Sequence, residues 1–467
     1  MVNNKRGLFL FHRDFRIEDN VGLNRAFSMS DELYTCFIFT PEQVSKTNQY
    51  KSNNAVQFMI EGLIELSQTI HNKGGELMCF YGKQIDILRK IIRILDVDAI
   101  YFNRDYTPYA IERDNATKQL CKEIDVVCQT FSDYYLFEPG TVVSDGSGAA
   151  YKKYTPFYNK VINMNVREPV IKRSFNFVKY SGSRIEEKIL LSEAMNRFTK
   201  PNPNILVRGG RKYAKRLLVQ ALRDQKNYDT TRDFFTKQTT HLSASIKFGC
   251  ISIRELYYAI KRKFGIQHGI IRELIWREFF AHVLYAYPEV VGKSYQPAFR
   301  KIKWSNNNSN IEKWQNGLTG VPIVDASMRE MNSTGYMHNR GRMTVASFLI
   351  KTLLIDWRVG EQYFAQQLTD YDLASNNGNW QGISGTGVDM KPYFRDMNPW
   401  IQSYKFDPSA KYIKMWIPEL AAVAPSDIHK WDTMCDDEKY KNIRYPKPIV
   451  NYDDQKVKML AMYKRAL

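Results

Sequence analysis

The chain has 467 residues, of which 44% are hydrophobic and 25% charged, as expected for a folded globular protein with more than one domain. Lysine and arginine total 67 against 49 acidic residues, and the net charge of +18 indicates either a polyanionic partner, nucleic acid first, or a solvated basic surface. The 6 scattered cysteines argue against zinc, iron–sulfur and disulfide sites, no apolar stretch reaches the ~18–20 residues of a membrane span, and we expect a soluble, intracellular protein without a metal.

The first part of the chain alternates short apolar runs with amphipathic stretches. We predict buried strands at 7–11, 33–39, 76–80, 98–102 and 126–131, and helices at 53–74, 84–95 and 108–124. This alternation predicts a doubly wound α/β domain with a parallel sheet. No GxGxxG follows the first strand, so the usual dinucleotide fingerprint is absent.

The rest of the chain has a different character. Turn and linker residues such as SDGSG and KPNPN interrupt the pattern, and all 8 tryptophans follow residue 275. Helical spacing dominates the remainder, so the C-terminal domain is predicted to be all-α. The predicted helices are 208–225, 250–264, 268–287, 321–335 and 342–368. The predicted domains are 1–131 (α/β), 132–205 (linker) and 206–467 (all-α).

One segment, DYDLASNNGNWQGISGTG at 370–387, has the composition of an irregular loop. Its four glycines and three asparagines favour turns and caps. A solvent-exposed loop has little use for the tryptophan at its centre, Trp380. The residues alone leave open what this loop holds.

Three polar patterns leave a functional and a structural interpretation open. Glu273, Trp276 and Arg277 share one helix face, and they indicate either a planar ligand or an ion-paired acid beside a core indole. The hydroxyls of 239–249 suit phosphate contacts or, more commonly, helix capping. The arginines of HNRGRM, 338–343, suit a salt bridge, a phosphate clamp or a solvated surface.

The sequence resembles the DNA photolyase/cryptochrome family over nearly its whole length. The resemblance rests on RELIWREFF, TGVPIVDASMRE, STGYMHNRGRM, DYDLASNNGNWQ and PYFRDMNP, with FHRDFRIEDN and YKKYTPF nearer the N-terminus. It implies FAD in the helical domain and an antenna chromophore of unknown identity in the α/β domain. It also implies a monomeric lyase that repairs UV-damaged DNA when its excited, reduced FAD donates an electron to a flipped-out cyclobutane pyrimidine dimer.

The resemblance assigns residues to the flavin site. Asn376 matches the position that faces flavin N5, and Asp370 is expected to pair with Arg342. The full flavin-binding set is Tyr228, Thr239, Thr240, Leu242, Ser243, Arg277, Arg342, Asp370, Asp372 and Asn376. Trp380, Trp357 and Trp304 match an electron relay that runs from the flavin to the surface.

The resemblance also assigns the DNA contacts. Glu273 would hydrogen-bond the dimer and Trp276 would stack on it. Arg232, Arg340 and Arg395 match phosphate-contacting positions, which gives the basic charge a role. Asn339 and Met343 would also line the DNA site. The implied catalytic set is Glu273, Asn376, Trp304, Trp357 and Trp380.

Three features favour a class I cyclobutane-dimer photolyase. Asn376 is the residue type that photolyases place opposite N5, and Asn339 and Met343 replace the two histidines of enzymes that repair the (6-4) photoproduct. The chain also ends soon after WIPEL, without a long signalling tail. The alternatives are a cryptochrome-like photoreceptor without repair activity and a flavin-free nucleic-acid-binding protein.

Two positions depart from the family pattern. Gly382 stands where these photolyases carry a second aromatic residue in the lesion pocket, which supports the photoreceptor alternative. Losing one stacking wall worth ~1–3 kcal/mol need not abolish binding. Ala110, next to Tyr109, stands where folate-binding members use an acid, so the antenna could be a deazaflavin, a folate, another group or none.

Overall fold

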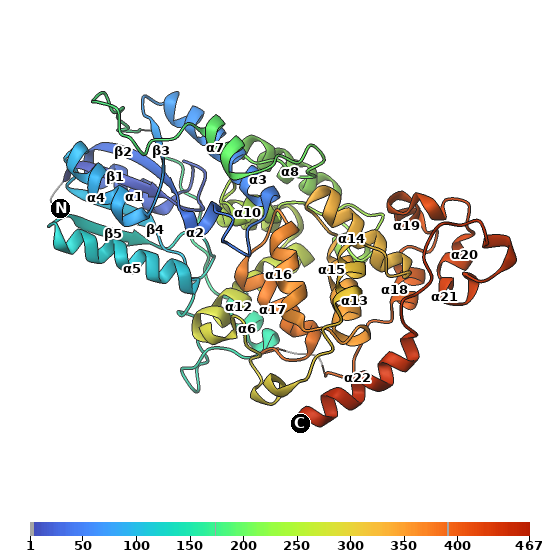
Figure 1. The fold of residues 1–467 in the computed structure, drawn as a ribbon. Helices are drawn as coiled ribbons and strands as arrows, with labels where there is room; N and C mark the ends of the chain where they lie inside the picture. The colour runs from blue at the N-terminus through green and yellow to red at the C-terminus, as the bar shows by residue number, and fades with distance from the viewer. Residues whose placement is uncertain (1–3, 173, 390–391) are drawn as a thin grey trace.

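The α/β domain is built on one parallel sheet. The structure is a computed structural model that describes residues 4–172, 174–389 and 392–467, so the first three residues of the predicted 1–131 domain lie outside it. Its five strands follow the order β3-β2-β1-β4-β5 and all pair in parallel (Figure 1). The strands are β1 Asn4–Phe11, β2 Ser30–Phe39, β3 Leu77–Tyr81, β4 Ala99–Asn103 and β5 Val127–Phe131. The predicted doubly wound fold is confirmed.

Alternate residues of the strands face two different layers. Phe9 and Phe37 pack in one core with helices α1 Val21–Met29 and α3 Asn53–His71. Leu10 and Ile38 pack in another, with α4 Gln84–Leu95 and α5 Pro108–Glu123. The strands are apolar on both faces, so they appear in the sequence as continuous hydrophobic runs. The first core continues into helices of the second domain and joins the two domains through apolar contacts.

The segment predicted to be a linker lies partly along the sheet. Its backbone forms hydrogen bonds with strands β2 and β3. The Leu33 amide of β2 donates to the Asn176 carbonyl, and the Ile189 amide donates to the Cys79 carbonyl of β3, both at 2.9 Å. It also forms helices α6 Tyr154–Val161 and α7 Leu191–Phe198. The segment therefore covers the α/β domain as well as connecting it.

The C-terminal domain is helical, as predicted. Its longer helices are α8 Arg211–Asp224, α11 Ile253–Phe264, α12 Gly269–Ala286, α13 Asn308–Gln315, α14 Pro322–Thr334, α15 Asn339–Ser347, α16 Trp357–Gln367, α17 Leu373–Ser384, α18 Pro399–Phe406 and α22 Tyr452–Ala466. Its short helical segments are α9 Tyr228–Thr231, α10 Ser243–Lys247, η1 Pro288–Val290, η2 Pro297–Lys301, η3 Phe348–Thr352, α19 Lys411–Trp416, η4 Pro418–Leu420, α20 Pro425–Ile428, α21 Trp431–Met434 and η5 Glu438–Tyr440, and α2 Pro41–Val44 lies in the first domain. Across the described ranges, no helix is long and apolar enough to cross a membrane.

The prediction of one helix over 342–368 is wrong. α15 passes into the π-helical turn η3, and α16 starts only at Trp357. Leu354 between them has a φ of 58°, which no helix continues through. The Asp356 side chain then caps α16 by accepting a hydrogen bond of 3.0 Å from the Arg358 amide. The apolar pattern hid this break because both pieces are buried.

The prediction of a loop at 370–387 is also wrong, since α17 occupies 373–384. Asp372 caps the helix by accepting from the Ser375 amide at 3.1 Å, and Gly385 ends it with a φ of 76°. Gly378 lies against Phe280 of α12, where a Cβ atom would come within 2.1 Å of the ring. Glycine therefore serves close helix packing here, not irregular backbone.

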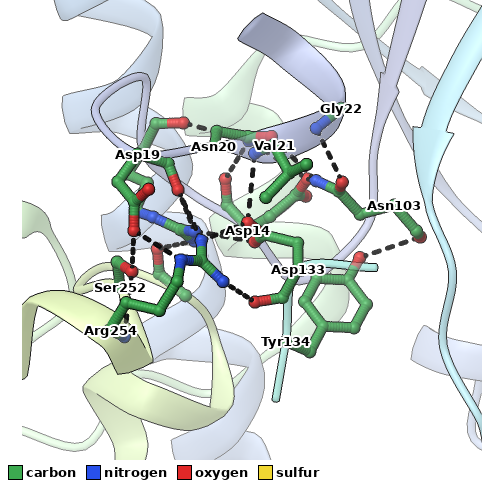
Figure 2. Close-up of polar contacts among 12 residues, drawn as sticks. Asp14, Asp19, Asn20, Val21, Gly22, Asn103, Asp133, Tyr134, Ser252 and Arg254 are labelled. Atoms are coloured by element: carbon green, nitrogen blue, oxygen red, sulfur yellow. Dashed lines mark hydrogen bonds and ion pairs between the residues drawn. The ribbon is translucent and has the colours of Figure 1, made fainter. Parts of the chain in front are cut away.

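A buried polar network fixes the two domains together, and we call it the joint: Arg16, Asp19, Asp133, Ser252 and Arg254. Figure 2 shows Asp19, Asp133, Ser252 and Arg254 pointing toward one another. Arg16 and Arg254 each contact one carboxylate oxygen of Asp133 at 2.7 Å, and Arg254 contacts Asp19 at 2.8 Å. Burial alone would raise the pKa of Asp133, but the two arginines lower it to about 2. Asp133 is therefore held as a carboxylate between its two arginines.

Candidate functional site

The acids at the start of α17 are both paired with arginines. Arg342 binds Asp370 with two bonds, of 3.1 and 2.9 Å, so the expected pair is present. Asp372 is bound at 3.0 Å by Arg13, which follows strand β1 in the other domain. Arg13 also contacts Asp105 at 3.0 Å. The bond between Arg13 and Asp372 therefore connects the sheet to the N-cap of α17.

Three cations, Lys247, Arg13 and Arg277, lie around Asp372. Burial raises the pKa of Asp372, but Lys247, Arg13 and Arg277 lower it well below its usual range. Burial and Arg13 in turn lower the pKa of Lys247, which has no ion pair with any carboxylate in the described part of the chain. Partly compensated cations in a buried site favour an anionic ligand.

The segment before α10 supplies hydroxyl and imidazole groups to the same region. The Thr239 hydroxyl lies 3.2 Å from that of Tyr336, and the Thr240 hydroxyl accepts from the Leu242 amide at 3.4 Å. Leu242 is the N-cap of α10 and Ser243 its first residue, so no hydroxyl caps this helix. His241 Nδ1 and Ser245 Oγ are buried and form no hydrogen bond with any of the described residues. This donor set fits a bound pyrophosphate, and with it FAD.

Asn376 lies inside the helix pair α16 and α17. Its amide nitrogen donates to the backbone carbonyl of Glu361 at 3.0 Å. The Glu361 side chain is buried, and burial raises its pKa to about 7 against the opposing hydrogen bonds of Asn377 and Tyr50. One of its oxygens has no partner. Sequence reasoning did not identify this carboxyl, because only the packing of α16 on α17 buries it.

The three tryptophans of the predicted relay belong to one apolar region. Trp380 and Trp357 are buried in the same core, and Trp304 packs against it. Gly360 lets Trp380 approach α16, because a Cβ atom there would lie 2.1 Å from the indole. A fourth tryptophan, Trp314, lies 6.4 Å from Trp380 between ring centroids and was not predicted. The order of electron transfer through these rings stays a prediction.

Two ion pairs lie on the face formed by α9, α12 and α15, and we call their members, Arg232, Asp233, Glu273 and Arg340, the acid–base face. Arg232 binds Glu273, and Arg340 binds Asp233 at 2.6 Å. On α15, the Asn339 amide lies 3.8 Å from the sulfur of Met343. The carbonyl of Arg395 accepts a hydrogen bond from buried Lys351. Residues predicted for two different roles, phosphate and lesion binding, thus contact each other.

Tyr228, the remaining predicted flavin residue, opens α9 beside this face. Its ring lies 5.8 Å from the guanidinium carbon of Arg232 and 6.1 Å from the ring of His268. Burial and Glu273 raise the pKa of its hydroxyl. Tyr228 therefore lies between the predicted phosphate arginine and the interior of the domain.

Trp276 is held by a residue that the sequence did not single out. Tyr154 of α6 stacks on it with ring centroids 3.6 Å apart and planes 4° apart. The Tyr154 hydroxyl donates to the Arg272 carbonyl at 3.0 Å, and its amide donates to Asp389 at 2.8 Å. Gly382 is open, since a Cβ atom there would meet no atom of the described residues within 4 Å. The stack supplies an aromatic wall at Trp276, and Gly382 leaves space on α17.

The carboxyl ends of β1 and β4 form a second candidate site, at the point where the strand order reverses. His12 Nε2 is buried there without a hydrogen-bond partner. Burial and Arg113 keep the pKa of His12 well below its usual value, so the ring is neutral. Tyr109 is 45% exposed at the start of α5, whereas Ala110 is buried. Over the described ranges, no three His, Cys, Asp or Glu side chains could hold a metal ion.

Two family models and a relative of similar sequence all point to DNA photolyases. The family model for DNA photolyase matches residues 7–170, and that for the FAD binding domain of DNA photolyase matches 270–465. The deoxyribodipyrimidine photo-lyase of Buchnera aphidicola subsp. Baizongia pistaciae is 34% identical over 98% of either chain.

Solved structures of this fold include repair enzymes and a cryptochrome. An archaeal photolyase from Sulfolobus tokodaii, crystallised with two FAD molecules, is 40% identical with a TM-score of 0.87, over 98% of this chain and 100% of that one. A cryptochrome from Synechocystis sp. PCC6803 is 25% identical with a TM-score of 0.89, over 99% of this chain and 100% of that one.

Proposed function

Because the chain belongs to the DNA photolyase family, we propose that it repairs cyclobutane pyrimidine dimers in UV-damaged DNA with light. It is a carbon–carbon lyase with FAD as cofactor. The observation that carries the proposal is the position of α12, which presents Glu273 and Trp276 at a partly exposed face and directs Arg277 towards Asp372. One helix thus serves both the lesion site and the cofactor site.

FAD would be held by groups from several elements. Arg342 with Asp370, the cap of α17 at Asp372 and Asn376 would contact the flavin end. Lys247, Arg277 and the hydroxyls near α10 would contact the pyrophosphate. Bound and reduced, FAD supplies on illumination the electron that opens the cyclobutane ring. Trp380, Trp357 and Trp304 would return electrons to this site from the surface through one apolar core.

The chain's own residues bind and orient the lesion. Trp276 provides a stacking surface for the flipped bases, and Glu273 a hydrogen bond to a base carbonyl. Arg232, Arg340 and Arg395 neutralise phosphates on either side of the lesion. A dimer stacks poorly in the duplex, so flipping it out costs less than flipping a normal pair.

The type of residue at three positions narrows the proposed substrate specificity. Asn376, Asn339 and Met343 support class I cyclobutane-dimer specificity. We also propose that the enzyme acts as a monomer inside the cell, where its substrate is. The second FAD of the Sulfolobus tokodaii structure supports a second chromophore here too, at the carboxyl ends of β1 and β4 beside His12.

The experiment uses protein with fully reduced FAD and an oligonucleotide that carries one thymine dimer. Restored thymines are counted by chromatography under blue or near-UV light, with a dark control and a Glu273→Ala variant. We expect restoration only in the light, and slower restoration in the variant. If neither single- nor double-stranded substrate is repaired by flavin-loaded protein, the chain is not a repair enzyme.

The photoreceptor alternative rests on Gly382. The space at Gly382 removes one aromatic contact but leaves Glu273 and Trp276 in place. The match over nearly the whole of a photo-lyase supports repair rather than signalling.

A further inference from the structure

Both arginines of the acid–base face are paired with carboxylates that belong to the same face. Arg340 is bound to Asp233, and Arg232 to Glu273. Asp233 has no other proposed role, whereas Glu273 is the proposed contact of the dimer. While Arg232 and Glu273 bind each other, the arginine is not free for a phosphate and the carboxylate is not free for the lesion.

This pair is accessible enough to exchange partners. The side chains of Arg232 and Glu273 are 34% and 39% exposed. Ion pairs at such positions contribute only ~0–1 kcal/mol, because water screens them and ordering two long side chains costs entropy. A DNA phosphate offers Arg232 a competing charge, and releasing the counterions of DNA adds a favourable term. Arg232 can therefore move to a phosphate at little cost.

The surroundings of Glu273 determine what the carboxyl does after release. Burial raises the pKa of Glu273, while Arg232 and then Arg272 lower it, and Asp233 raises it. Tyr154 and Tyr228 also face this carboxyl, as its effect on their own pKa values shows. Without Arg232, burial and Asp233 oppose Arg272, which is itself bound to Asp229, so proton uptake is favoured. A protonated carboxyl can donate a hydrogen bond to a base carbonyl.

We propose that Arg232 leaves Glu273 for a backbone phosphate when DNA binds, and that the released Glu273 then hydrogen-bonds the flipped dimer. This inference rests on the proposed function. It makes lesion recognition depend on phosphate recognition, because the carboxyl becomes available only where the backbone is correctly placed. On undamaged DNA, Glu273 loses its ion pair and gains no hydrogen bond from a dimer. The cost of breaking the pair therefore weakens binding to undamaged DNA and increases the preference for damaged DNA.

The test measures dark binding of undamaged duplex against salt by fluorescence anisotropy. In Glu273→Gln, Arg232 has no carboxylate to leave, so we expect roughly three- to ten-fold tighter binding at each salt concentration, with an unchanged salt slope because both proteins make the same phosphate contact. The variant should lose preference for dimer-bearing duplex. Glu193→Gln removes the same charge from an exposed pair with Arg197 on α7 and should change neither quantity.

The double variant Arg232→Gln/Glu273→Gln identifies the partner. Its affinity for undamaged duplex should equal that of Arg232→Gln, because no arginine remains to be freed. The inference is overturned if Glu273→Gln binds undamaged duplex no tighter than wild type, or if the gain persists in the double variant. These readouts use undamaged DNA in the dark, so failure of the exchange and failure of repair are told apart by the thymine assay.

Discussion

The joint and the acid–base face contain the same chemistry at different depths. In the joint, side chains of Arg16, Arg254, Asp19 and Asp133 are at most 4% exposed. On the acid–base face, the paired side chains are 16% to 39% exposed. Breaking a buried pair leaves a charge without water, whereas an exposed pair exchanges partners freely. Burial thus decides whether an arginine–carboxylate pair holds domains together or receives a ligand.

Arg13 combines both roles. It leaves the sheet beside the joint, its own side chain is 8% exposed, and it binds Asp372 at the start of the proposed flavin helix. Its guanidinium also lies 4.8 Å from the ring of Tyr134. This buried pair positions Asp372, so a residue of the α/β domain helps to shape a site in the other domain.

The largest effect is expected from breaking the joint. Arg254→Ala removes the partner of Asp19 and Asp133 and should lower the free energy of unfolding by about 3–5 kcal/mol. Denaturant unfolding measures this, with Arg197→Ala, from an exposed pair, as the matched control at under about 1 kcal/mol. Equal losses in the two variants would remove the distinction between buried and exposed pairs.

The next effect is expected at Arg13. Arg13→Gln should lower the free energy of unfolding by about 2–3 kcal/mol, since hydrogen bonds to charged groups are lost. It should also release FAD on dilution, because Asp372 keeps only Lys247 and Arg277 as neighbouring cations. The flavin-to-protein absorbance ratio after gel filtration measures this. Arg104→Gln, from a half-exposed pair with Glu138, should retain FAD.

The free energy of unfolding at low pH should depend on the ionisation of Asp133. Its folded pKa of about 2 lies below its ordinary value, so its contribution is present above about pH 4 and is lost as the pH falls through 2. The loss should be about 2 kcal/mol. Unfolding of wild type and Asp133→Asn between pH 5 and 2 tests it. A wild-type curve parallel to that of the variant would show that Asp133 is not stabilised as an anion.

A gain is expected from filling the space at Gly382. Gly382→Trp should tighten binding of dimer-bearing DNA by about 1–2 kcal/mol through stacking, with no change for undamaged DNA. The glycine at 146, also open, provides the matched Gly146→Trp control. Binding titrations in the dark measure both. Tighter binding to undamaged duplex as well would place residue 382 outside the lesion pocket.

The smallest effect is expected behind Trp276. Tyr154→Leu removes the stacked ring and should weaken dimer binding by about 0.5–1.5 kcal/mol, while Tyr154→Phe keeps the stack and the affinity. Trp276 fluorescence provides a second readout. If Tyr154→Leu binds dimers more tightly, Tyr154 covers the stacking surface and does not support it.

The sequence predicts the sheet well, because its strands are apolar on both faces and leave a local signal. It fails at α17, where Asp372 caps the helix, the Asn376 amide donates to the Glu361 carbonyl and Gly378 packs against Phe280. Arg13 and Asp372 are 359 residues apart, so no local pattern indicates their pair. Tyr154 was assigned to a linker for the same reason. The roles of the site residues were predicted from the family resemblance, whereas the contacts between their side chains became visible only in the fold.

Hydrogen–deuterium exchange with and without a dimer-bearing duplex in the dark tests the contrast between the two regions most directly. Residues 12–20 and 250–256, in and around the joint, should stay protected in both states. Exchange at 228–234 and in the first turns of α12 should change when DNA is present. Unchanged exchange on the acid–base face, or an opening of the joint on DNA binding, would contradict this contrast.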